Sequence, residues 1–247
     1  MPNESQMPGK LYLIPNIIHP NTENEVIAPL IFSVVKNLDY YLVENERTAR
    51  RYLSNLMKLL PANERTPIEL LKFEKLDKNT TEEEVSNLLQ PVRSGRNCGI
   101  LSESGCPGIA DPGSQAAMAA HEMKIEIIPL PGPSSIFMAL MASGMNGQSF
   151  TFHGYLPIDK QQLISKIKQL ENSAINLKQT QIFIETPYRN KRIFDTLIST
   201  CNNRISLCLA LDITSPDAFI KTRTIGEWKS KKMSLEKVPA VFLLSAQ

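Results

Sequence analysis

The sequence has few cysteines and histidines, and it has no long apolar run. Its four cysteines form no CxxC pair, and its three histidines lie at no ligand spacing from them, which gives a zinc site little support. No apolar run approaches the roughly 20 residues that a membrane span needs. The opening stretch MPNESQMPGK lacks the hydrophobic core of a signal peptide. Because unpaired thiols suit a reducing compartment, we expect a cytoplasmic protein without a metal or a membrane segment.

An excess of charge of either sign is also missing. The 27 basic and 25 acidic residues leave a net charge of +2. This balance neither indicates nor excludes a nucleic-acid partner. With 42% hydrophobic and 21% charged residues in 247 positions, the composition is that of a globular protein with one large domain or two small ones.

The common phosphate-binding motifs are absent as well. The sequence contains no GxxxxGK[ST], and no GxGxxG follows any expected strand. These absences argue against a phosphate cradle and against a dinucleotide enzyme. A nucleoside ligand without phosphates remains open.

Strand and helix patterns alternate along almost the whole chain, which predicts right-handed crossovers and mostly parallel sheets. Threonine and glutamate at positions 22 and 25, and again at 81 and 84, have the spacing of helix capping boxes. The expected strands cover residues 10–15, 40–44, 68–73, 98–103, 125–130, 181–185, 205–212, 218–225 and 238–245, and residues 149–157 are expected to form a strand followed by a turn. The expected helices in the first half include 22–38, 46–60 and 81–93.

The glycine-containing stretch GMNGQ at 144–148 is the best candidate for a domain boundary. We therefore predict two α/β domains, residues 1–148 and 149–247, with a mixed sheet in the second domain.

Two loops rich in glycine and proline follow consecutive expected strands. The first, SESGCPGIADPG at 102–113, places three of the chain's 11 glycines within nine residues. The second is PLPGPSS at 129–135. Ligands of open α/β sheets bind at the carboxyl ends of the strands, and small residues there leave main-chain groups approachable. Either loop alone could be only a tight turn, but the two together favour a binding site for a ligand read by main-chain hydrogen bonds.

The segment from Leu101 to Pro157 resembles the core of the tetrapyrrole (corrin/porphyrin) methylase superfamily, and most of all the branch that contains ribosomal RNA small-subunit methyltransferase I. That branch reads S-D-A-G-T-P-x-I-S-D-P-G, then P-x-P-G-P-S-A, then F-x-F-x-G-F-L-P. Two further segments, VENERTARRYL at 43–53 and FIETPYRN at 183–190, resemble the branch's E-D-T-R-x-T-R-x-L-L and F-x-E-S-P-H-R. The resemblance covers about residues 9–245.

This resemblance implies two α/β domains with a cleft between them, S-adenosylmethionine (SAM) as methyl donor, S-adenosylhomocysteine as product, and commonly a homodimer. SAM agrees with the motif absences, because it has an adenosine and an amino acid but no phosphate. The family's SAM-binding segments map onto Ser102, Glu103, Ser104, Gly105, Cys106, Pro107, Ala110, Asp111, Pro131, Gly132, Pro133, Ser134, Ser135, Phe183, Ala210, Leu211, Pro239 and Ala240.

Methyl transfer needs above all a methyl group and a nucleophile held near contact distance. A ribose 2′-hydroxyl acceptor, as in the ribosomal RNA branch, also needs a group that takes its proton. The catalytic candidates are Glu44, Arg47, Glu103 and Glu185, with Glu46 as a further acid and with Arg50 and Arg189 as further binders of phosphate or carboxylate. Cys106, where the family has threonine, could be a reactive thiol or a small buried residue.

The chain departs from the family pattern mainly on the acceptor side. Its first loop, PNIIHP, lacks the glycine of T-P-I-G-N-L, and E-D-T-R is replaced by Glu44-Asn45-Glu46-Arg47. The leading hypothesis is a SAM-dependent methyltransferase that acts on RNA. Two alternatives stay open: a catalytically silent SAM-binding module, and a methyltransferase of a tetrapyrrole-like small molecule.

Overall fold

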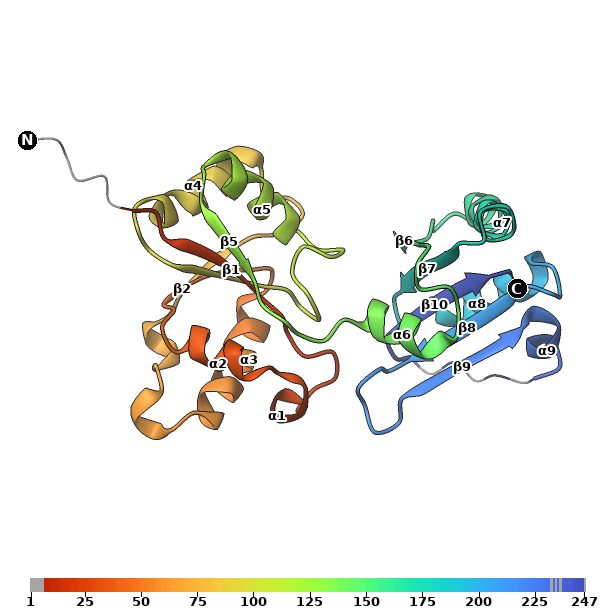
Figure 1. Cartoon of the computed structure of the whole chain (residues 1–247), viewed down its shortest axis with the longest axis horizontal. Coiled ribbons are helices and arrows are strands. Elements are labelled where there is room, and N and C mark those ends of the chain that lie inside the picture. The colour runs from red at the N-terminus through yellow and green to blue at the C-terminus, as the bar shows by residue number, and fades with distance from the viewer. Residues whose placement is uncertain (1–6, 232, 234, 236, 247) are drawn as a thin grey trace, which may run out of the picture. The chain divides into compact units, whose positions relative to one another are not determined.

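The chain divides into two units in the computed structural model, which describes residues 7–231, 233, 235 and 237–246 (Figure 1). Unit 1 is Met1–Ser134 and unit 2 is Ser135–Gln247. The division lies before the stretch at 144–148 that the sequence suggested as a boundary. The reason is helix α6 (Ser135–Ser143), whose Ile136 and Leu140 pack in the same apolar cluster as Leu243 of the second sheet.

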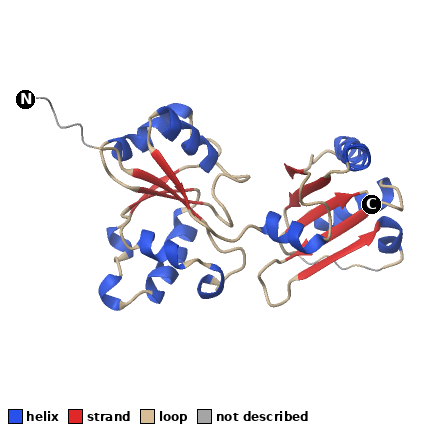
Figure 2. Cartoon of the chain, in the orientation of Figure 1, coloured by secondary structure: helices blue, strands red, loops and turns tan. Residues whose placement is uncertain are grey.

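Unit 1 contains a five-stranded sheet in which every pairing is parallel, as the alternation of strands and helices predicted (Figure 2). The strand order is β3-β2-β4-β1-β5. The strands are β1 (Lys10–Ile14), β2 (Tyr40–Val43), β3 (Lys72–Lys75), β4 (Cys98–Leu101) and β5 (Glu126–Pro129). Because β1 and β4 lie at the centre, the loops that follow them meet at the carboxyl edge of the sheet.

Helices cover both faces of this sheet (Figure 1). On one face, α2 (Pro29–Val35) and α3 (Glu46–Leu59) pack in one apolar cluster with Tyr41 and Val43 of β2. On the other face, α4 (Glu82–Arg93) and α5 (Gly113–Glu122) pack with Leu42 and Ile100. The alternation of strand side chains between two buried faces explains why the inner strands β2 and β4 are buried along their whole length and contain no charged residue, whereas the edge strands β3 and β5 contain charged residues.

Three local predictions for unit 1 need comment. The single helix expected over 22–38 is broken into α1 (Glu23–Val26) and α2, because Pro29 disfavours a helical Ala28. The prediction of a capping box at Thr22 was wrong, because the Thr22 hydroxyl donates to the His19 carbonyl oxygen (2.7 Å) and makes no hydrogen bond that caps α1. The box at Thr81 and Glu84 is confirmed.

The strand expected at 68–73 begins only at Lys72. Ile68–Leu70 form a 3-10 turn directly after Pro67, and a second such turn covers Ala62–Glu64. Pro67 provides a φ suited to the turn. Ile68 and Leu71 therefore pack in the apolar cluster of α2 and α3 from a turn rather than from a strand, while Leu70 is exposed.

Unit 2 contains a mixed sheet of order β6-β7-β10-β8-β9, which confirms the predicted fold class. Its strands are β6 (Phe150–Tyr155), β7 (Thr180–Glu185), β8 (Ser206–Leu211), β9 (Phe219–Thr224) and β10 (Ala240–Ser245). Only β6 and β7 pair in parallel; the other three pairings are antiparallel.

Three helices cover one face of the second sheet, and α6 covers the other. The three are α7 (Lys160–Leu177), α8 (Asn190–Thr200) and α9 (Ile225–Lys229). The indole of Trp228 on α9 is buried and donates to the Leu207 carbonyl oxygen (2.9 Å). Within the described ranges, no helix is both long and apolar enough to cross a membrane.

Candidate functional site

The loops that follow β1 and β4 are joined to each other through Asn16. The main-chain N–H of Asn16 donates to the Gly105 carbonyl oxygen (2.8 Å), and the main-chain N–H of Gly105 donates to the Asn16 carbonyl oxygen (3.2 Å). The buried Asn16 side chain donates to the carbonyl oxygens of Ser102 (2.9 Å) and Glu103 (3.3 Å). Asn16 was not predicted as a site residue, although its place directly after the first strand was a usable signal. It holds the start of the glycine- and proline-rich loop in one conformation.

Asp111 organises the second half of this loop. Its Oδ1 accepts hydrogen bonds from the amides of Gly108 and Gly113, both at 2.7 Å. Gly108 has φ +82° and Ala110 has φ +61°, and alanine adopts this left-handed region only at an energetic cost. Asp111 Oδ2 is buried and bonds to none of the residues that the structure describes. Burial raises the pKa of this carboxyl, while the two amides that donate to it lower the pKa.

The loop after β5 is fastened to the same edge of the sheet. The Cys106 thiol donates to the Pro133 carbonyl oxygen (3.5 Å), and burial raises the pKa of this thiol. Cys106 is therefore a protonated donor rather than a reactive thiolate at neutral pH. A Cβ atom at Gly132 would lie 2.2 Å from Pro15 Cβ, so this position tolerates only glycine without a shift. The three loops after β1, β4 and β5 thus form one connected surface.

We expect Gly132→Ala to lower both the stability of unit 1 and the affinity for SAM. The added methyl group would overlap the rigid ring of Pro15, and such overpacking costs about 1–3 kcal/mol. Thermal unfolding and calorimetric titration with SAM measure the two effects. Gly147→Ala is the matched control, because a Cβ there meets nothing within 4 Å. Equal behaviour of the two variants would show that the approach of Gly132 to Pro15 is not needed.

Acidic side chains gather beside this surface. Glu44 directly follows β2, Glu103 follows β4, and the negative charges of Glu103 and Asp111 act on Glu44. A cavity of about 10 Å³ is lined by Glu44, Ser102 and Asp111 among others. The Glu103 carboxylate accepts a hydrogen bond from the Thr48 hydroxyl on α3. The structure therefore brings two of the predicted catalytic acids and a predicted SAM-binding acid together.

The other three residues of the Glu44–Arg47 segment, which are Asn45, Glu46 and Arg47, form the N-terminus of α3. Asn45 caps the helix, with its side-chain oxygen accepting from the amides of Arg47 (3.0 Å) and Thr48 (3.4 Å). Glu46 pairs with Arg50 (2.7 Å), and the Arg50 guanidinium also lies over the Phe73 ring. Arg47 is exposed. Asn45 thus supplies the capping oxygen of α3, and Arg47 is more exposed than Arg50.

We expect Glu44→Gln to raise the melting temperature at pH 7 and to raise it less at pH 4. The pKa of Glu44 is raised mainly by burial, then by Glu103, Asp111 and Asp77, with Lys78 opposing. When a carboxyl has a higher pKa in the folded than in the unfolded state, the folded protein loses stability as the pH rises from the unfolded-state pKa to the folded-state pKa. The neutral amide removes that loss. Calorimetry at both pH values tests the effect, and an equal difference at both would contradict it.

Three of the predicted SAM-binding residues of unit 2 also lie together at one edge of the second sheet: Ala210, Leu211 and Ala240. Ala240, at the start of β10, pairs with Glu185 at the end of β7 and with Leu211 at the end of β8. Ala210 pairs with Val241 one position further in. The backbone register alone therefore gathers these residues, which are far apart in the sequence.

Glu185 differs from the other catalytic candidates because its side chain is completely buried. It forms an ion pair with Arg189 (3.1 Å) and accepts from the Thr186 amide (2.7 Å). Arg189 in turn donates to the carbonyl oxygens of Leu156 (3.1 Å) and Pro157 (2.9 Å). This geometry joins the loop after β7 to the loop after β6, and it makes Glu185 a positioning residue in the structure described.

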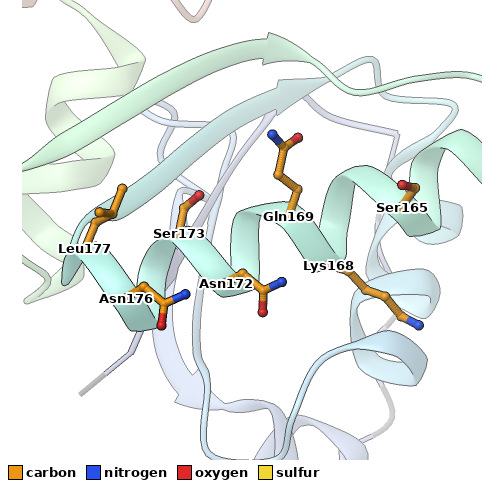
Figure 3. Close-up of a pocket in the computed structure, with 7 residues that line it drawn as sticks. All are labelled: Ser165, Lys168, Gln169, Asn172, Ser173, Asn176 and Leu177. Carbon is orange, nitrogen blue, oxygen red and sulfur yellow. The ribbon is translucent and has the colours of Figure 1, made fainter.

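Two other surface hollows lie on unit 2. A shallow depression along α7 is lined by Ser165, Lys168, Gln169, Asn172, Ser173, Asn176 and Leu177. Figure 3 shows that these side chains project from one helix and do not converge. A cavity of about 500 Å³ beside Lys178, Ser206 and Ser245 lies at the opposite edge of the second sheet from Glu185. Among the described residues, no cluster of three or more His, Cys, Asp or Glu could hold a metal ion.

Comparison with curated proteins finds similar sequences, although no family model matches the chain. A ribosomal RNA small subunit methyltransferase I from Halalkalibacterium halodurans is 28% identical over 207 residues, which cover 83% of this chain and 65% of that protein. The Vibrio cholerae protein of the same name is 25% identical over 237 residues, covering 95% and 76%. The chain thus spans less than two thirds of the length of the Halalkalibacterium relative.

Comparison with solved structures finds the same fold in methyltransferases. The methyltransferase CobJ matches with a TM-score of 0.62 and 18% identity, over 96% of this chain and 94% of that one. A uroporphyrin-III C-methyl transferase from Thermus thermophilus, complexed with S-adenyl homocysteine, matches with a TM-score of 0.51 and 14% identity, over 96% and 97%. The resemblance in sequence and the predicted fold are both confirmed.

Proposed function

We propose that this chain, which is similar in sequence to ribosomal RNA small subunit methyltransferase I and has the tetrapyrrole methylase fold, is a SAM-dependent methyltransferase that acts on RNA. The observation that carries the proposal is the connected surface formed by the loops after β1, β4 and β5. Asn16 and Cys106 hold these loops to one another through hydrogen bonds of 2.8–3.5 Å, and Asp111 fixes the loop after β4 internally through two hydrogen bonds of 2.7 Å. The surface presents mainly main-chain groups, as a nucleoside and an amino acid require.

The charge of this surface fits SAM better than it fits a phosphorylated cofactor. Residues 102–113 and 129–135 contain two acidic residues and no basic residue. SAM has a positive sulfonium and a positive ammonium group, which Glu103 and Asp111 would attract, whereas phosphates would be repelled. The unpartnered Asp111 Oδ2 gives a buried acceptor at the same place. When bound, SAM supplies an electrophilic methyl group.

The acceptor side of the proposal rests on Glu44, Glu103 and Arg47. The raised pKa of Glu44 makes its carboxylate a stronger base than an exposed glutamate, which suits removal of a ribose 2′-hydroxyl proton. Glu103 is fixed by Thr48 and can share this role. Arg47 is available for a phosphate of the RNA. Methylation at the ribose oxygen, a homodimer and a cytoplasmic location are further parts of this proposal that follow from the family resemblance.

Two measurements in sequence test the proposed function. Calorimetric titration with SAM and S-adenosylhomocysteine should show binding, and failure to bind at millimolar ligand would refute a SAM enzyme. Transfer of a radiolabelled methyl group to total RNA should then show activity, which Glu44→Gln and Glu103→Gln should reduce. Binding without labelling of RNA would favour the silent module, and labelling only of a tetrapyrrole would favour the small-molecule alternative.

A further inference from the structure

Two exposed tyrosines leave the second sheet at the same edge. Tyr155 ends β6 and is 56% exposed, and Tyr188 lies in the loop after β7 and is 82% exposed. β6 and β7 are parallel neighbours, with Tyr155 paired to Ile184. Tyrosines so accessible are unusual, because the ring is largely apolar and normally lies at least partly buried.

The surroundings hold these tyrosines in fixed loops. Arg189, the residue after Tyr188, donates to the carbonyl oxygens of Leu156 and Pro157, the two residues that follow Tyr155. The buried Asn190 side chain donates to the Val238 carbonyl oxygen (2.7 Å). The loops after β6 and β7 and the entry to β10 are therefore connected, so that both rings are presented on an ordered base.

The same segments are basic. Residues 154–160, 186–192 and 237–240 contain five basic residues and one acidic residue. Arg189 and Lys191 pair with Glu185 and Asp195 outside these ranges, which leaves Lys160, Arg192 and Lys237 against Asp159. Lys237 Nζ lies 5.3 Å from the centroid of the Tyr188 ring, in a cation–π contact. Arg192, which is exposed, donates to the Ile158 carbonyl oxygen (2.7 Å). Aromatic faces and cations thus share one surface.

We propose that Tyr155, Tyr188 and Lys237 form a stacking platform for single-stranded RNA. Unpaired bases would lie on the tyrosine faces, and Lys237 would bind the adjoining phosphate, which is the combination that single strands require. The positive charge favours a polyanion over a second copy of this chain, because a symmetric contact would bring like charges together. This inference rests on the proposed RNA acceptor, and it names the part of unit 2 that holds it.

Fluorescence anisotropy with a labelled single-stranded RNA oligonucleotide tests the platform. Tyr155→Ala and Tyr188→Ala should each weaken binding about 5- to 150-fold, the range of one lost base stack. Tyr155→Phe and Tyr188→Phe should bind nearly as well as the wild type, because they keep the ring. Leu177→Ala is the matched control: it removes an exposed apolar side chain at the far end of α7 and should change nothing.

The salt dependence of RNA affinity distinguishes the contribution of the Lys237 charge from that of the tyrosine rings. Lys237→Ala should reduce the slope of log affinity against log salt by about 0.7, the value of one phosphate contact to a single strand. The tyrosine variants should leave this slope unchanged. An unchanged slope in Lys237→Ala would overturn the assignment of Lys237.

The remaining outcomes distinguish this inference from the proposed function. If the wild type methylates RNA and the alanine variants bind RNA normally, the platform is wrong and the proposed function stands. If the wild type neither binds nor methylates RNA while still binding SAM, both are wrong. If sedimentation shows that the alanine variants dissociate an oligomer without losing RNA affinity, the surface is a contact between copies and the platform is overturned.

Discussion

Replacing Asp111 with alanine is expected to lower the affinity for SAM at least tenfold and to destabilise unit 1 by about 2–4 kcal/mol. Asp111 Oδ1 is the acceptor for the amides of Gly108 and Gly113. A buried donor that loses its acceptor costs about 1–3 kcal/mol, and two donors would lose theirs. The loop would then no longer be held in the conformation that presents its main chain.

The loss of affinity follows from the backbone conformation that Asp111 maintains. Ala110 is held at φ +61°, where a non-glycine residue is strained by about 1–3 kcal/mol. Without the Asp111 carboxylate this residue would relax, and the loop between Gly108 and Gly113 would change shape. Because a ligand read by main-chain groups depends on that shape, binding should fall even where the fold survives.

Calorimetric titration with SAM and thermal unfolding measure the two parts of this prediction. Asp111→Asn is the control, since its amide oxygen can still accept from both amides while the negative charge is lost. We expect it to retain most of the stability and to lose part of the SAM affinity. If Asp111→Ala bound SAM as tightly as the wild type, the proposed role of this loop in SAM binding would be refuted.

Glu185→Ala is expected to destabilise unit 2 by about 2–4 kcal/mol, because it leaves the half-buried Arg189 without its charge partner. The Glu185 side chain is fully buried, and the Arg189 side chain is only 20% exposed. The loops after β6 and β7 would lose their shared anchor. Chemical denaturation with urea gives the free energy of unfolding directly.

A double variant distinguishes a stabilising role of the Glu185–Arg189 ion pair from a catalytic role of Glu185. Glu185→Leu with Arg189→Met removes both charges, and replacing a whole buried pair by apolar residues is often close to neutral. The double variant should therefore be more stable than Glu185→Ala. If Glu185→Ala instead kept its full stability and lost only methyl transfer, Glu185 would be a catalytic residue that touches the reacting atoms.

Much of the fold was predictable because it depends on periodic patterns. The apolar strands that alternate with amphipathic helices fixed the parallel sheet of unit 1, and Thr81 with Glu84 marked the start of α4. The early start of unit 2 was not predicted, because it depends on the packing of α6 against the second sheet, a tertiary contact that no local sequence pattern shows. The break before Pro29 was readable in principle, since proline restricts the residue that precedes it.

The candidate site was predicted in its composition but not in its internal contacts. The glycine- and proline-rich loops pointed to exposed main chain, yet the pairing of Asn16 with Gly105 joins segments almost 90 positions apart. Likewise, the sequence placed Glu185 at a strand end but could not show that Arg189 buries and neutralises it. Side chains that act through distant partners leave no local pattern to read.

The end of β6 has one more consequence, which concerns aggregation. β6 is an edge strand, and such strands can pair with strands of other chains. Its register against β7 shifts between Phe152 and Tyr155, as at a β-bulge. A bulge breaks the regular spacing of free amide and carbonyl groups that an incoming strand needs. The register shift before Tyr155 thus also makes this edge of the sheet a poor template for one more strand.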